Sequence, residues 1–242
     1  MKFILGRKLN MSAVWTKDGA RIPVTVLEAG PCKVVQVKTR DRDGYSGVQI
    51  GFGRKKQLSD ALRGHMKNDT FQYLREFQIP ESEQIAAGQM ITVKEFEPGE
   101  YVNVSGIMKG RGFAGAVKRH GFHGAPASHG HDHPRAVGSI GSRFPQHTLK
   151  GTRMAGRMGG NQSTLKNTFV VDTDPERNLL YVMGPVPGTR GGLVKIMTTG
   201  EKKEAPEIFE ASPNPQATPI EPVTSEQTAN PKEEVKTEEK TA

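Results

Sequence analysis

The segment 103–167 constrains the fold of this chain most, because its 65 residues show neither helical nor strand periodicity. It contains thirteen glycines, ten lysines or arginines and six of the seven histidines, but only one acidic residue, Asp132. A structureless insertion of this length normally argues against a compact domain. The exception is a segment whose order comes from a partner, so we expect 103–167 to form an extended arm that binds another molecule.

Short β-branched segments separated by turn residues flank the arm on both sides. Strands are predicted over 22–27, 33–38, 45–52, 71–77, 91–96, 101–107, 168–172, 179–183 and 193–197, and only 58–66 looks helical. Asp18-Gly19 and Asp43-Gly44 are placed as hairpin turns, and 174–178 is a turn-forming group. Strands this short predict a mainly β fold, a small antiparallel β-barrel with residues 1–102 and 168–200 as its body and the arm as an irregular inserted extension.

The end of the chain has a different composition. Residues 201–242 are rich in Glu, Pro, Thr and Lys with few large apolar side chains, which predicts a disordered acidic tail. The tail holds ten of the acidic residues and five lysines, so 29 basic residues face 16 acidic ones in positions 1–200. A basic excess of this size favours a polyanionic partner, either nucleic acid or an anionic membrane surface.

Several features reduce the possible partners and locations. No apolar run approaches the roughly 18 residues that a membrane span needs, and no basic stretch has an apolar helical face, so we expect no membrane partner. The apolar run 3–5 is too short for a signal-peptide core. Cys32 is the only cysteine, which excludes an intramolecular disulfide and fits a reducing compartment, so a cytoplasmic location is expected.

Two motifs in the arm suggest other classes of function. The glycine spacing of 110–115 matches a nucleotide-binding turn, but that motif needs a following helix, for which Gly121, Gly124 and Pro126 leave no room. Asp132 has no carboxylate partner for acid-base chemistry, so we expect no enzyme, no cofactor and no small-molecule substrate. A histidine-rich metal-binding module remains the alternative, although no cysteine is near the histidines.

Folded RNA is the partner that this composition favours. Arginine pairs bidentately with phosphate and stacks on bases, while nothing in the arm supplies a recognition helix for the major groove of DNA. The candidate RNA-binding residues in the arm are its cations and clustered histidines: Lys109, Arg111, Lys118, Arg119, His120, His123, His129, His131, His133, Arg135, Arg143, Lys150, Arg153, Arg157 and Lys166.

Several ordered motifs resemble the bacterial branch of large-ribosomal-subunit protein three, the universal uL-three family. They are Leu5-Gly6-Arg7-Lys8, Ile22-Pro23-Val24-Thr25-Val26, Asp43-Gly44-Tyr45, Arg119-His120-Gly121-Phe122, Ala125-Pro126-Ala127-Ser128-His129-Gly130, Gly138-Ser139-Ile140-Gly141, Met154-Ala155-Gly156 and Arg177-Asn178-Leu179-Leu180. The resemblance covers positions 1 to about 200 and adds Arg7 and Lys8 to the candidate contacts.

The resemblance implies a β-barrel of the translation-protein type on the subunit exterior and an arm that reaches through 23S rRNA toward the peptidyl transferase centre. It also implies binding near the 3′ end of that rRNA, a part in nucleating 50S assembly, and neighbouring large-subunit proteins as further partners. Some bacterial members carry a methylated glutamine after the Gly-Ser-Ile-Gly motif. Gln146 is the candidate here, although its surroundings, 142–147, depart from the usual pattern, and the acidic tail is not part of the family pattern.

Overall fold

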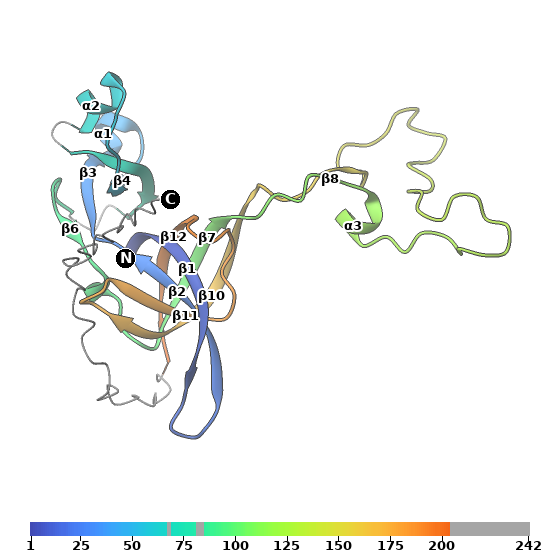
Figure 1. Ribbon diagram of the computed structural model, residues 1–242. Coiled ribbons are helices and arrows are strands. Elements are labelled where there is room, and N and C mark those ends of the chain that lie inside the picture. Colours follow the sequence, from blue (N-terminus) through green and yellow to red (C-terminus); the bar gives the residue numbers. More distant parts are fainter. Residues whose placement is uncertain (67–68, 81–84, 204–242) are drawn as a thin grey trace, which may run out of the picture. The chain divides into compact units, whose positions relative to one another are not determined.

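The computed structural model describes residues 1–66, 69–80 and 85–203 (Figure 1). Six antiparallel strands close into a barrel in the order β1-β12-β7-β10-β11-β2. Their bounds are β1 Phe3–Trp15, β2 Arg21–Ala29, β7 Glu100–Ile107, β10 Gln162–Asp174, β11 Leu179–Met183 and β12 Leu193–Lys202. The predicted mainly β, antiparallel fold is therefore confirmed, and β10, β11 and β12 complete the barrel after the arm.

The barrel strands follow from the alternation of apolar and polar side chains. In β7, for example, Val102 and Val104 are fully buried, whereas Tyr101 and Asn103 between them are only partly covered. Successive side chains of a strand point to opposite faces, so this alternation places one face in the core. At the Asp174-to-Asn178 turn between β10 and β11, the Asp174 carboxylate accepts the backbone N–H groups of Glu176 and Arg177. This local bond explains why the predicted turn forms.

A second sheet departs from the sequence prediction, which assigned all strands to one barrel. It has the order β5-β4-β3-β6, with β3 Cys32–Lys38, β4 Gly47–Arg54, β5 Phe71–Gln78 and β6 Met90–Ile91. The helices α1 Arg40–Asp43 and α2 Asp60–Met66 connect its strands, and the predicted strand 91–96 is mostly the 3-10 helix η1 Val93–Glu95. The rings of Phe3 in β1 and Phe77 in β5 stack with their centroids 4.8 Å apart, so the two sheets share one core.

Strand β1 was not predicted, and its packing explains why. Its first residues, Phe3, Ile4 and Leu5, are all buried in succession. Side chains on both faces of this part of β1 contact apolar neighbours because the strand lies against the barrel core and also against the second sheet. Burial on both faces removes the alternation by which a strand is recognised from sequence.

Among the described residues, none of the helices has the length and hydropathy that crossing a bilayer requires.

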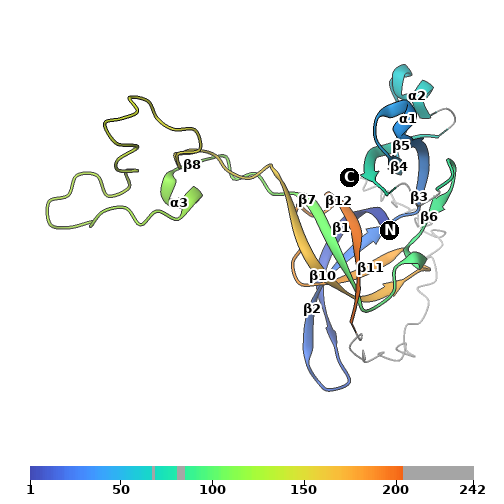
Figure 2. The same cartoon turned by 180° about the vertical axis from the view of Figure 1, so that it is seen from behind.

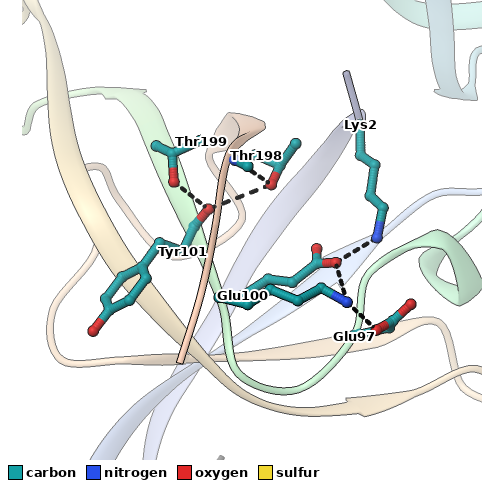
Figure 3. Close-up of polar contacts among 8 residues, drawn as sticks. Lys2, Glu97, Glu100, Tyr101, Thr198 and Thr199 are labelled. Carbon is teal, nitrogen blue, oxygen red and sulfur yellow. Dashed lines mark hydrogen bonds and ion pairs between the residues drawn. The ribbon is translucent and has the colours of Figure 1, made fainter. Parts of the chain in front are cut away.

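A cluster of charges links the chain start to one end of the barrel (Figure 3). The carboxylate of Glu100, only 3% exposed, forms ion pairs with Lys2 and, at 3.7 Å, with Lys202. Lys202 also donates to Glu97, and this hydrogen bond lowers the pKa of the Glu97 carboxyl. Beside this cluster, the Thr199 hydroxyl donates to the Tyr101 carbonyl at 2.9 Å. These contacts join β7 and β12 to Lys2, the residue directly before β1.

We predict that Glu100→Gln lowers the free energy of unfolding by about 1–3 kcal/mol, because it weakens charge-assisted bonds to a buried acceptor. Urea denaturation at neutral pH measures this change. The matched control is Glu97→Gln, since the Glu97 side chain is 60% exposed and water replaces its partner. Equal stability of Glu100→Gln and the unsubstituted protein would contradict the role given to this carboxylate.

Candidate nucleic-acid interface

Two barrel strands continue directly into the arm. The pairing of β7 with β10 runs as far as Ile107 opposite Gln162. The strand predicted over 101–107 is therefore confirmed, whereas the prediction that 103–167 lacks strand periodicity was wrong for 162–167, which belong to β10. Beyond it, Met108 donates its N–H to Asn161 at 2.9 Å, and Arg111 donates to Met158 at 2.9 Å. The short strands β8 Phe113–Ala114 and β9 Gly156–Arg157 extend the same antiparallel pairing. We call residues 108–114 and 156–161 the stem, and both views show its two chains side by side (Figures 1 and 2).

One glycine is essential to the stem. Gly159 has a φ of +74°, and a Cβ at this position would lie 2.1 Å from the carbonyl oxygen of Lys109. No other residue type tolerates both this backbone conformation and this close approach. The two chains of the stem therefore approach closely because glycine stands at 159.

A short helix, α3 Ala116–His120, follows the stem and ends at Gly121 in the left-handed conformation. The prediction that no helix follows the glycine-rich turn was therefore wrong, although α3 has only five residues. The guanidinium of Arg119 and the Nε2 of His120 both bond the carbonyl of Met154, at 2.8 and 3.0 Å. These bonds hold α3 against the returning chain. Because Arg111 donates its N–H to the Met158 carbonyl and Met158 donates its own N–H to the Gly112 carbonyl, these amides of the stem do not form a free phosphate-binding turn.

The part of the arm beyond α3, residues 122–153, makes few bonds with itself; we call it the arm loop. It contains three backbone-to-backbone hydrogen bonds, Ala125 to Pro134, Ala136 to His133 and Thr152 to Leu149, whereas folded proteins average about two such bonds for every three residues. All its residues are exposed except four that are half-buried: Phe122, Ala125, Val137 and Thr152. Most of its backbone groups therefore remain available to water or to a partner.

The cations of the arm, in the arm loop and outside it, are exposed to solvent. Among the described residues no arm cation forms an ion pair, whereas in the body Lys33 pairs with Asp69 at 2.8 Å and Lys38 with Glu76 at 2.6 Å. The exposed candidate residues are Lys109, Arg111, Lys118, Arg119, His123, His129, His131, His133, Arg135, Arg143, Lys150, Arg153, Arg157 and Lys166, and His120 is half-buried. The structure thus brings together a positive surface that its own carboxylates do not neutralise. Arg119 also has the internal role described above.

Arg7 and Lys8 belong to the barrel strand β1. The Arg7 guanidinium lies 5.8 Å from the ring centre of Phe52 and 5.9 Å from that of Tyr73, and it donates to Gln72. Lys8 donates to the carbonyl of Val186 at 2.5 Å. Burial lowers the pKa of the Lys8 ammonium, and the positive charge of Lys109 lowers it further. Both side chains thus have partners within the body, which favours a structural role over RNA contact.

The histidines do not assemble into a metal centre in the part of the chain that the structure describes, where no group of three or more potential ligands is placed to hold an ion. His131 and His133 lie edge to face, 6.5 Å between ring centres, and the backbone N–H of His133 donates to His131 Nδ1. This arrangement gives the metal-binding alternative no support. Gln146 is exposed in the arm loop, and its modification stays a prediction.

Sequence reasoning gave no weight to the aromatic side chains of the arm. Phe113 is 80% exposed and Phe144 is 67% exposed, and Arg143 lies 5.8 Å from the ring centre of Phe144. Exposed aromatic rings between cations are typical of surfaces that stack nucleobases. The signal was present as phenylalanine within a glycine-rich basic segment, where no apolar core is available to bury it.

Known proteins match both the body and the arm. The family model described as Ribosomal protein L3 matches residues 74–178, which include β7, the entire arm and all of β10. Large ribosomal subunit protein uL3 of Thermotoga petrophila is 48% identical over 208 residues, covering 84% of this chain and 100% of the relative. The chain belongs to the ribosomal protein L3 family. The uL3 protein of Carboxydothermus hydrogenoformans is 47% identical, and the match covers 81% of this chain and 96% of the relative. The uL3 protein of Synechococcus sp. strain JA-3-3Ab is 46% identical, and the match covers 80% of this chain and 94% of the relative.

Membership in the ribosomal protein L3 family confirms the resemblance derived from the sequence motifs. It also confirms the prediction that the chain is not an enzyme, because the family consists of structural ribosomal proteins. The predicted disordered tail, 201–242, begins too early, because β12 extends to Lys202 and Lys203 donates its N–H to the Gly99 carbonyl. From 204 onward the tail lies outside the described residues.

We predict that Gly159→Ala opens the stem without unfolding the barrel, because alanine is strained at this φ and collides with the Lys109 carbonyl. Amide hydrogen exchange of Arg111 and Met158 should become faster by roughly tenfold or more, while the midpoint of thermal unfolding hardly changes. Gly110→Ala is the matched control in the same stem, since a Cβ there meets nothing within 4 Å. Equal exchange in the two variants would show that close approach at Gly159 does not hold the stem.

Proposed function

We propose that this chain is a structural RNA-binding component of the large ribosomal subunit and binds 23S rRNA through its arm. The relatives that it matches over nearly their whole length are named as large-subunit proteins. In this proposal the body, 1–102 and 168–200, is a folded anchor, and the arm, 103–167, is the RNA-binding part. The arm neutralises phosphates that converge where RNA helices meet, and the chain itself performs no chemistry.

The observation that carries this proposal is the combination of exposed, unpaired cations with a backbone that makes few bonds of its own. Ten lysines and arginines occur in 103–167 against one acid, and none of these cations forms an ion pair in the part of the chain that the structure describes. A soluble surface normally mixes both signs of charge. An irregular surface of phosphates supplies the missing anions, and RNA hydroxyl and phosphate oxygens supply acceptors for the free backbone N–H groups.

The finer part of the proposal rests on the family resemblance. It holds that the arm reaches toward the peptidyl transferase centre, and that the protein binds near the 3′ end of 23S rRNA and helps nucleate 50S assembly. It includes neighbouring large-subunit proteins as partners of the body. The length of the paired stem supports the first point, because a narrow two-stranded extension places the arm loop away from the barrel core.

We predict that replacing Arg135 and Arg143 together with Gln weakens binding to a transcript of the 3′ region of 23S rRNA. The slope of log K against log salt concentration should fall by about two, since each lost phosphate contact removes slightly less than one released counterion. Titrations of full-length protein at several salt concentrations measure this slope.

The matched control replaces Arg63 and Arg177 with Gln. Both lie on the body and already have carboxylate partners, Asp60 at 3.2 Å and Asp174 at 3.9 Å. Their loss should leave the slope unchanged. If the two double variants behave alike, the arm is not the RNA-binding surface and the proposal fails.

A further inference from the structure

A hollow of about 570 Å³ lies within the distal part of the arm, formed by three segments that are separate in sequence. It is lined by 120–125, by residues of 131–138 and by Arg153. Its volume is within the range of sites that bind small organic groups, about 300–1,000 Å³. The general attraction of a basic arm for phosphate does not require any such concave site, so the hollow needs its own explanation.

Specific bonds build this hollow from segments that otherwise have few contacts. Ala125 donates its N–H to the carbonyl of Pro134 at 3.1 Å, which joins the first two segments. The chains approach so closely there that a Cβ on Gly124 would lie 2.1 Å from the Pro134 oxygen. The bonds of Arg119 and His120 to the Met154 carbonyl hold the third segment in place. The three bonded backbone positions thus fix the walls of the hollow.

The lining has the chemistry of a nucleotide site. Phe122 is half-buried at the wall, with its ring centre 6.1 Å from that of His120. Arg153 is exposed and forms no ion pair in the described part of the chain, and no carboxylate is among the described lining residues. An aromatic ring beside an unpaired guanidinium suits one base and its phosphate, since bases stack on aromatic faces and arginine pairs with phosphate oxygens.

Two of the lining histidines have an assigned hydrogen-bonding role. Nε2 of His120 donates to the Met154 carbonyl, which can only accept, and therefore carries a hydrogen. Nδ1 of His131 accepts the backbone N–H of His133 at 3.1 Å, so this nitrogen has no hydrogen and Nε2 of His131 is left to donate. Because His120 is bonded to the chain and His131 presents a donor, these imidazoles suit an acceptor-rich ligand better than a metal ion.

We propose that the hollow binds a single nucleotide of the RNA, unstacked from its neighbours, with its base against Phe122 and its phosphate paired to Arg153. This inference rests on the proposed function and specifies how the arm recognises RNA at one point. Phosphate contacts elsewhere on the arm bind any folded RNA, whereas the hollow requires an unpaired, accessible base. The site therefore selects an RNA position where one base lies outside a helix.

The test compares Phe122→Leu with the control Trp15→Leu in full-length protein bound to the 23S rRNA transcript. Leucine keeps an apolar side chain but removes the ring, so Phe122→Leu should weaken binding roughly tenfold, the effect of losing one stacked base. Its salt slope should stay unchanged because no charge is removed. Trp15 is an exposed aromatic residue of the body, outside the arm, and Trp15→Leu should bind within about twofold of the unsubstituted protein.

Arg153→Gln provides the second variant, at an exposed position where folding is not at risk. It should weaken binding and lower the salt slope by about one. Ultraviolet crosslinking of the complex, followed by mass spectrometry, should find a nucleotide remnant on peptides from 120–125 or 131–138. If Phe122→Leu binds as tightly as Trp15→Leu, or if those peptides carry no nucleotide, the inference is overturned.

The same measurements separate this inference from the proposed function. If the unsubstituted protein shows no salt-dependent affinity for the transcript, the proposed function fails and the nucleotide site fails with it. If that affinity is present while both hollow variants bind normally, only the nucleotide site fails. Binding that is lost with EDTA and restored by zinc would assign the hollow to a metal ion and also overturn the inference.

Discussion

The pairing of β7 with β10 is the interaction on which the rest of the structure depends. Both strands belong to the closed barrel, and both continue past its end into the stem. The barrel has an apolar core that includes Val104, Val170 and Ile196, all fully buried, so its strands are ordered by hydrophobic burial. The stem has no apolar core of its own and is ordered by backbone hydrogen bonds that continue the pairing of the barrel strands.

The arm loop differs from the barrel, because hydrophobic burial contributes little to its stability and its surface is dominated by positive charge. Only four of its residues are even half-buried, and its cations face water instead of carboxylates. Charges of one sign on an open loop repel one another, and a polyanion removes this repulsion while it releases counterions. The same chain thus combines a body stabilised by its own contacts with an arm loop that has few contacts of its own.

Sequence reasoning located the features that depend on local pattern. The alternation around Val102 and Val104 predicted β7, and Leu179–Met183 was predicted with the bounds that the structure has. The unusual composition of 103–167 predicted the arm. These features could be predicted because each depends on residues that are neighbours in the sequence.

Features that depend on distant contacts were missed. The first residues of β1, Phe3 to Leu5, are buried by elements far along the chain, and the contacts of Arg7 with Phe52 and Tyr73 are not visible in its sequence motif. RNA binding by Arg7 stays a prediction. The first part of β10, which includes Thr164, was missed because polar residues interrupt the alternation there. The hollow could not be predicted from the sequence, because Phe122 and Arg153 line the same site only after the chain has turned back.

Amide hydrogen exchange of the free protein and of the protein within large subunits tests the central claim most directly. The account predicts slow exchange in the barrel in both states, because its amides are paired within the core. Residues 122–153 should exchange rapidly in the free protein and become protected in the subunit, where RNA supplies their acceptors. Equally slow exchange of these residues in the free protein, or equally rapid exchange in the subunit, would contradict the account.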